Sequence, residues 1–169
     1  MKKYLSLLMV ALLAMFSFSA CDVETDEEPG GTNVEKMAGQ WDVTVDAVDE
    51  TGKVINTDPY GLGTITLMTY NTAANTSNEM WISDNKNFWD FAMKVAVDYN
   101  NRSFSAAEAI YKAGGEGKAV ITNGKVLEGK ATNLHGMPND SIVFDIKFSD
   151  DDKGLIYRIS GQRYTGFHE

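Results

Sequence analysis

Alternation of apolar and polar residues is the feature that most limits what this chain can fold into. It is clearest at residues 41–47, 91–99 and 142–148, where every second side chain is apolar. A period of two places successive side chains on opposite faces of an extended backbone. Each stretch is therefore predicted to be a β-strand with one buried face. Good helix formers gather only at residues 106–112, a segment too short to hold as a helix without packing.

Weaker strand patterns fill the intervals between these three. They lie at residues 63–70, 79–83, 102–107, 118–122, 125–131 and 155–164, with turn-forming residues between them. The strongest turn signal is Asn123-Gly124, because this pair readily takes the positive φ angles of a two-residue hairpin turn. We therefore expect a hairpin between residues 118–122 and 125–131, and a single helical turn at residues 33–37.

Eight or nine short strands with tight connections predict an antiparallel meander in an all-β protein. A meander of that length exposes two edges unless it closes on itself. The expected fold is therefore an up-and-down barrel of about eight strands, with a two-sheet sandwich as the alternative. A barrel of this size either fills its interior with side chains or holds one small ligand.

The first residues are typical of a secretory signal peptide. Lys2 and Lys3 precede an apolar run at residues 4–16, and small residues follow up to Ala20. The run is shorter than the roughly 20 apolar residues of a membrane span. We expect a signal peptide at residues 1–20, an acidic flexible tether at 21–35 and a barrel domain at 36–169.

Cys21 is the only cysteine and follows the apolar segment directly. The stretch Phe18-Ser19-Ala20-Cys21 resembles the processing box of bacterial lipoproteins, which implies that Cys21 is lipidated and becomes the mature N-terminus. An unprocessed free thiol is the alternative. The acidic residues that follow, up to Glu28, also resemble the surface-export signal of lipoproteins in the Bacteroidetes. The resemblance implies an exported outer-membrane lipoprotein, with exposure at the cell surface left open.

The charge of the chain argues against two kinds of partner. Removing Lys2 and Lys3 from 15 basic residues leaves 13 against 24 acidic residues, a net charge of about −11. Such a surface repels nucleic acid and anionic membrane, and nothing in the sequence resembles a basic patch. We therefore expect the membrane to be reached through the lipid anchor and no nucleic acid to be bound.

Gly39-Gln40-Trp41 opens the first predicted strand and resembles the G-x-W motif of lipocalins and the wider calycin group. In that group the tryptophan closes one end of the barrel and packs against an arginine near the end of the last strand. The resemblance implies that Trp41 has this role, with Arg158 or Arg163 as its cationic partner. The sequence does not choose between the two arginines.

The chain from about residue 35 to 169 also resembles the lipid-binding hydrolase family of Bacteroidetes lipoproteins, which is calycin-like. The resemblance rests on residues 39–43, on 80–84 continuing to Phe88-Trp89, and on the ending at 159–167. It implies a lipid-like ligand. It brings no catalytic residues, so the hydrolase activity in the family's description has no assigned site.

Aromatic side chains are the main candidates for ligand contact, because ligand cavities favour apolar walls. The tentative set, which core packing would also explain, is Trp81, Phe88, Trp89, Phe91, Met93, Tyr111, Phe144 and Tyr157. Phe88 and Trp89 lie in a polar loop at residues 85–90, where burial in a core explains them less well. We expect these two residues to form a lid at an open barrel mouth.

Catalytic and metal sites are weakly indicated. His135 lies near Asp140 and Ser141, but no G-x-S-x-G nucleophile motif is present, and an exposed turn histidine is the simpler interpretation. The run of acids at residues 150–152 fits a solvated turn better than a calcium loop. We expect no metal and no cofactor.

The predicted function is therefore binding of a small apolar or amphipathic ligand by an exported, lipid-anchored barrel. Two alternatives remain open. One is a lipid or ester hydrolase with unidentified catalytic residues. The other is a surface module that binds glycan or protein and has a side-chain-filled interior.

Overall fold

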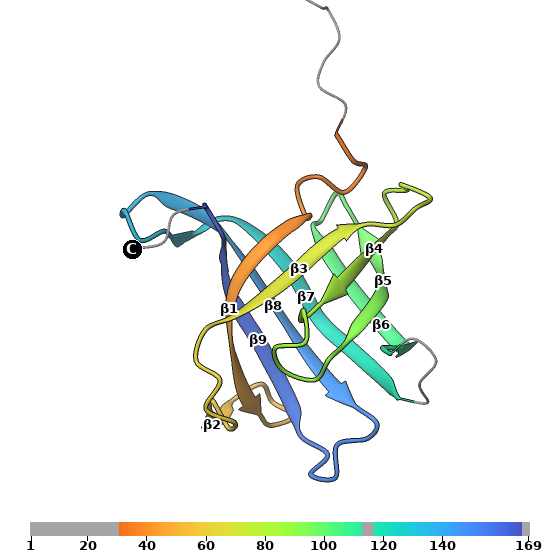
Figure 1. The fold of residues 1–169 in the computed structure, drawn as a ribbon, viewed down its shortest axis with the longest axis vertical. Coiled ribbons are helices and arrows are strands. Elements are labelled where there is room, and N and C mark those ends of the chain that lie inside the picture. The colour runs from red at the N-terminus through yellow and green to blue at the C-terminus, as the bar shows by residue number, and fades with distance from the viewer. Residues whose placement is uncertain (1–30, 113–116, 167–169) are drawn as a thin grey trace, which may run out of the picture. The chain divides into compact units, whose positions relative to one another are not determined.

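The computed structural model describes residues 31–112 and 117–166, and the chain from Thr32 onward forms one compact unit. The predicted signal peptide and Cys21 lie outside the described residues. Within these residues the fold is all-β and contains no helix (Figure 1). The strands are β1 (Gly39–Val48), β2 (Val54–Thr57), β3 (Ile65–Asn71), β4 (Glu79–Ser83), β5 (Ala92–Asp98), β6 (Ser103–Ile110), β7 (Lys118–Thr132), β8 (Pro138–Phe148) and β9 (Ile156–Arg163).

Eight of these strands form a closed antiparallel barrel, which confirms the predicted fold. From β3 to β9 each strand pairs with the next along the chain, and β1 pairs with β3. The last strand returns to the first, with a register that runs from Trp41 opposite Arg163 to Val48 opposite Ile156. Because both edges of the meander pair with each other, the barrel wall has no free edge.

The ninth strand, β2, was not predicted and stands outside the barrel circuit. It pairs only with the last part of β1, where Asp46 lies opposite Thr57. All four of its residues are exposed, including Val54 and Ile55. A four-residue strand with no buried face produces no alternation, so the pattern that revealed the other strands could not reveal this one.

The predicted Asn123-Gly124 hairpin is wrong. Residues 118–132 form one long strand, β7, and the register with both neighbouring strands shifts at this pair, as it does at a β-bulge. Asn123 does take a positive φ of 57°, and its Nδ2 donates to Asp145 Oδ2 at 2.8 Å. Gly124 has no positive φ, so the expected conformation occurs at only one residue of the pair. Because β7 pairs with both β6 and β8 on either side of the bulge, it continues as one strand and does not form a hairpin.

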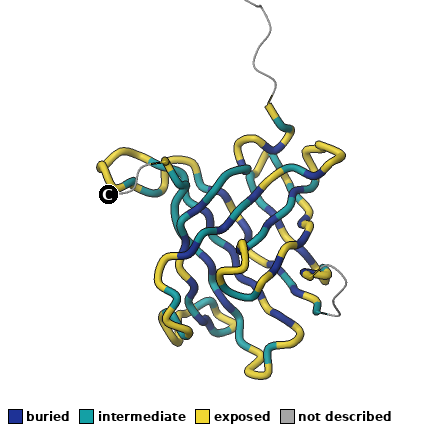
Figure 2. Tube along the Cα trace, viewed as in Figure 1, coloured by how far each residue is buried: buried dark blue, intermediate teal, exposed yellow. Residues whose placement is uncertain are grey.

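The core is formed by the alternate residues that point inward from the barrel strands. Figure 2 shows this alternation along the barrel strands as buried positions between intermediate or exposed ones. The buried residues include Trp41, Val43, Leu67, Met80, Ile82, Met93, Phe104, Ile121, Phe144, Ile146 and Ile159. The interior positions are therefore filled by side chains that bury one another. In the described ranges, no helix is long and apolar enough to cross a membrane.

Candidate functional site

One end of the barrel is closed by Trp41 and the turn that precedes β1. Val34 and Met37 in this turn are fully buried, so packing begins before the predicted boundary at residue 36. Trp41 Nε1 donates to Thr69 Oγ1 at 2.8 Å, and Thr69 Oγ1 donates to the Met37 carbonyl at 2.6 Å. This chain of hydrogen bonds fixes the turn to the barrel wall. We call this the Trp41 end.

Arg163 is the arginine that lies against Trp41. Its guanidinium carbon is 4.3 Å from the centre of the Trp41 rings, and its nitrogens donate to the carbonyls of Ala38 at 2.5 Å and Lys36 at 2.9 Å. Gly39 has no Cβ, and a Cβ there would meet the Arg163 guanidinium. The glycine of G-x-W therefore makes room for the cation that stacks on the tryptophan.

Arg158 has a different partner. It forms a two-point ion pair with Asp145, at 2.8 and 3.0 Å, and donates to the Gly52 carbonyl. Burial alone would raise the pKa of Asp145, but the hydrogen bonds from Arg158 and Asn123 and the positive charge of Arg158 outweigh it and hold that pKa below its usual range. Arg158 therefore links β9 to β8 and to the β1–β2 turn, and it takes no part in closing the Trp41 end.

The opposite end is covered by a cluster of aromatic side chains. Its members are Tyr60 from the β2–β3 loop, Phe88 and Trp89 from the β4–β5 loop, Tyr111 just after β6, Phe148 at the end of β8 and Tyr157 in β9. Trp89 stacks on Phe148 with ring centres 4.7 Å apart and planes 6° from parallel. Phe88 meets Tyr60, Trp89, Phe148 and Tyr157 at ring-centre distances of 5.2 to 5.9 Å. We call this set the aromatic cluster.

Two carboxylates of the β8–β9 loop accept hydrogen bonds from the aromatic cluster. Asp150 accepts from Trp89 Nε1 at 3.1 Å and from the Tyr111 hydroxyl at 2.5 Å. Asp151 accepts from the Tyr157 hydroxyl at 3.0 Å. Because that hydroxyl has only one hydrogen to donate, the Tyr60 hydroxyl donates to Tyr157 across their 2.8 Å separation. The indole N–H of Trp89 and the hydroxyls of Tyr111 and Tyr157 are thus hydrogen-bonded to the β8–β9 loop.

The pKa values of Tyr111 and of its carboxylate partner Asp150 reflect this hydrogen bond. Burial, together with the hydrogen bond to Asp150 and its negative charge, raises the pKa of Tyr111 to about 12. The hydrogen bonds from Tyr111 and Trp89 lower the pKa of Asp150. The neutral phenol and the ionised carboxylate are therefore the paired states at neutral pH.

Asp84 organises the loop that carries Phe88 and Trp89. Its side chain is fully buried, and its two oxygens accept five backbone N–H groups, from Lys86, Phe88, Trp89, Asp90 and Phe91, at 2.7 to 3.1 Å. Positive φ angles at Asn85, Lys86 and Asp90 bend the backbone around the carboxylate. A single side chain thus determines where the two aromatic residues of this loop lie.

The other predicted ligand-contact residues are distributed between three places. Phe91 is buried beside Phe148, with ring centres 5.8 Å apart, and so adjoins the cluster. Met93 and Phe144 are buried deeper in the barrel core. Trp81 faces outward, because its neighbours Met80 and Ile82 occupy the inward positions of β4.

Sequence reasoning missed several members of this end. Tyr60 and Phe148 were not among the candidates, and neither were Asp84, Asp150 and Asp151 as structural acids. Phe148 has the same alternation as Phe144, so the signal for it was present. Tyr60 belongs to a loop without periodicity, and its approach to Tyr157 depends on the tertiary fold.

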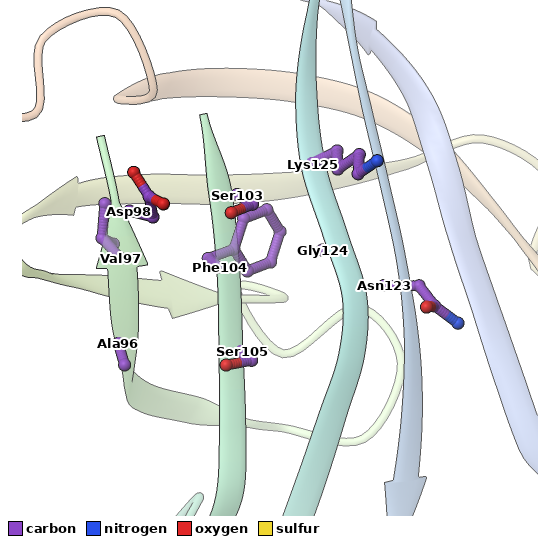
Figure 3. Close-up of a pocket in the computed structure, with 9 residues that line it drawn as sticks. All are labelled: Ala96, Val97, Asp98, Ser103, Phe104, Ser105, Asn123, Gly124 and Lys125. Carbon is purple, nitrogen blue, oxygen red and sulfur yellow. The ribbon is translucent and has the colours of Figure 1, made fainter. Parts of the chain in front are cut away.

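Two hollows lie on the outside of the barrel wall. One of about 360 Å³ opens over β5, β6 and β7, where Ala96, Ser103, Ser105 and Gly124 have little or no side chain (Figure 3). The ring of Phe104 lies over Gly124 there. Another of about 450 Å³ is lined by Thr44, Thr64, Thr132, Ser141, Ser160 and other polar residues. Both hollows are open to solvent and the second is lined mainly by polar residues, so neither resembles an enclosed apolar ligand chamber.

The residues near His135 make other contacts. Ser141 Oγ donates to the Gly161 carbonyl at 2.9 Å, and Asp140 accepts from the Gly129 N–H and pairs with Arg163. His135 is itself in the exposed β7–β8 turn. In the part of the chain that the structure describes, no group of three or more His, Cys, Asp or Glu side chains is placed to hold a metal ion.

Comparison with known families gives one match that covers most of the chain. The model of the family described as "Lipid-binding putative hydrolase" matches residues 26–168. No curated protein matches the chain significantly.

Proposed function

Because the chain belongs to the lipid-binding family whose model spans residues 26–168, we propose that it takes up one apolar or amphipathic lipid through the end covered by the aromatic cluster. The observation that carries this proposal is the construction of that end. Its cover is made of large apolar rings, and two of them, Phe88 and Trp89, are only partly buried on a loop arranged around Asp84. Trp41, which closes the other end, is fully buried.

Uptake requires movement of the loop at residues 84–91. Phe88 is only partly buried although it contacts four other rings, and Trp89 is likewise partly buried. Moving these two side chains outward would leave Phe91, Phe148 and Tyr157 as an apolar mouth. An acyl chain could then occupy the space vacated by Phe88, with Asp150 and Asp151 near its polar group.

We also propose that Cys21 carries the lipid anchor, and that the protein is an exported outer-membrane lipoprotein. The support is the sequence around Cys21 and the acidic segment behind it. Several acyl chains on one residue hold a soluble domain firmly, because each buried methylene contributes about 0.8 kcal/mol. Cys21→Ser should move the protein from the membrane fraction to the soluble fraction. Unchanged membrane association of this variant would refute the anchor.

The ligand class is tested with apo protein and a panel of fatty acids, lysolipids and sterols. We expect at least one class to change tryptophan fluorescence and to raise the melting temperature as ligand concentration rises. Binding should weaken in Phe88→Ala if the ligand takes the place of that ring as proposed. A panel that leaves both signals unchanged in the wild type would contradict ligand binding.

A second candidate, a surface module for glycan or protein, is favoured by the packed interior and by the hollows on the outer wall. The same panel separates the two functions, since a surface module would not respond to lipids. The hydrolase in the family description is tested with generic ester substrates. Equal rates for wild type and His135→Ala would remove the only site that the sequence suggested.

A further inference from the structure

The loops at the two ends of the barrel differ in charge. Those at the aromatic end contain Asp49, Glu50, Asp58, Asp84, Asp90, Asp150, Asp151 and Asp152. The three loops at the Trp41 end, residues 72–78, 99–102 and 133–137, contain no acidic residue. The acids near the Trp41 end include Glu35 in the entry turn and Glu79, Asp98 and Asp140 at strand ends, and two of these, Glu79 and Asp140, pair with Lys94 and Arg163. The connecting loops at this end therefore repel an anionic surface less than those at the aromatic end.

The β7–β8 hairpin also presents two large apolar side chains at the Trp41 end. Leu134 is 62% exposed and Met137 is 60% exposed. Residues 129–139 around them contain Lys130 and no acid. The turn has a fixed shape, because Asn133 Oδ1 accepts from the His135 and Met137 N–H groups at 3.0 and 2.9 Å. Figure 2 shows the tip as an exposed projection from the barrel.

The preceding chain joins the barrel at this same end. Asn33 N donates to Asn75 Oδ1 in the loop at residues 72–78, and Arg163 holds the carbonyl of Lys36. The stretch from Cys21 to Thr32 can extend over at most roughly 40 Å, since each residue spans about 3.3 to 3.6 Å. A lipid on Cys21 would therefore keep the Trp41 end within that distance of the bilayer.

We propose that the Trp41 end of the barrel rests on the lipid bilayer, with Leu134 and Met137 entering its interface and the aromatic cluster facing away. Three connecting loops without acids, the exposed Leu134 and Met137 on one hairpin tip, and the entry point of the chain occur together at this end. The inference builds on the proposed anchor and lipid ligand. It adds that the ligand reaches the mouth from the aqueous side and is not drawn directly from the bilayer that holds the protein.

The orientation is tested with the compact unit from Thr32 onward, which has its own core and closed sheet. An N-terminal polyhistidine tag would hold it on vesicles of phosphatidylcholine, a minor fraction of phosphatidylglycerol and a nickel-chelating lipid. The acyl chains carry bromine close to the headgroup, which quenches tryptophan at the interface. Leu134→Trp places the probe at the hairpin tip, and Ile55→Trp places it on β2, at the other end of β1.

We expect the added fluorescence of Leu134→Trp to be quenched at least about twofold more than that of Ile55→Trp. Adding Met137→Ser to Leu134→Trp should reduce that quenching. Equal quenching at the two positions, or stronger quenching at position 55, would overturn the orientation. Thermal melts check that each variant is folded, and both positions are exposed enough to accept tryptophan.

The tag replaces the anchor, and the vesicles are the only lipid supplied. A negative result would therefore count against the orientation alone. Cys21→Ser fractionation and the ligand panel test the anchor and the lipid ligand separately.

Discussion

Asp84 shows how one side chain can determine the position of a functional loop. A buried carboxylate normally needs a cation, but here five backbone N–H groups surround it. The same residue precedes the polar run Asn85-Lys86-Asn87, which predicted a turn and gave no indication that the acid was buried. At the residue scale, the sequence indicates which residue types are available, and the fold determines which of them lie together.

Replacing Asp84 should destabilise the barrel strongly. We expect Asp84→Ala to lower the free energy of unfolding by at least about 3 kcal/mol, because five backbone N–H groups lose their shared, fully buried acceptor. Asp90→Asn in the same loop is the control. The Asp90 carboxylate is exposed and 3.7 Å from Lys112, and asparagine tolerates the positive φ of 55° at this position, so the change should cost no more than about 0.5 kcal/mol. Urea unfolding measures both, and equal losses would show that Asp84 does not organise the loop.

Tyr111 should give the aromatic cluster a measurable pH dependence. Its pKa is raised from a usual value of 10.0 to about 12 in the folded protein, first by burial and then by Asp150. A raised folded pKa means that this stabilisation is complete below about pH 10 and is lost as pH rises through about 12.

The melting temperature of the wild type should therefore fall more steeply between about pH 10 and 12 than that of Tyr111→Phe, which has no phenol to ionise. Comparing the two proteins removes the shared effect of other tyrosines and lysines. Parallel falls over this interval would contradict the assigned contact between Tyr111 and Asp150.

At the scale of elements, alternation predicted the barrel strands well, and turn chemistry misled at one place. Strands β1, β5 and β8 lie where the clearest patterns are, whereas β2 has no buried face to reveal it. Asn123 has the positive φ expected of the turn but Gly124 does not, and the pair lies in a bulge of β7. The alternation in β4 places Trp81 on the face opposite the inward-facing Met80 and Ile82. The sequence therefore already indicated that Trp81 faces away from the interior, although it was included among the ligand-contact candidates.

The bulge in β7 depends on a residue without a side chain. A Cβ at Gly124 would meet the Phe104 carbonyl and ring, so we expect Gly124→Ala to cost about 2 to 3 kcal/mol of unfolding free energy. Gly129 in the same strand has a φ of +60° and open space around it, so Gly129→Ala should cost only about 1 kcal/mol. Chemical denaturation of the two variants checks the order. A larger loss at Gly129 would mean that the contact of Phe104 with Gly124 is unimportant.

At the scale of the whole molecule, the barrel has two unlike ends. Pairing of β1 with β9 completes the wall, hydrogen bonds secure the Trp41 end, and aromatic rings cover the other. The count of strands and the need to pair both edges were enough to predict closure. Which aromatic side chains meet at the mouth was not predictable, because they come from five loops and strand ends spread along the chain.

The most direct test of lipid uptake at the aromatic end is quenching by a fatty acid brominated along its chain. Trp89 lies in the aromatic cluster and Trp81 on the outer wall, so the protein contains both the probe and its control. We predict that the acid quenches wild-type fluorescence in a saturable way, that Trp89→Phe removes most of this quenching, and that Trp81→Phe preserves it. Quenching that survives in Trp89→Phe, or that disappears in Trp81→Phe, would contradict entry at this end.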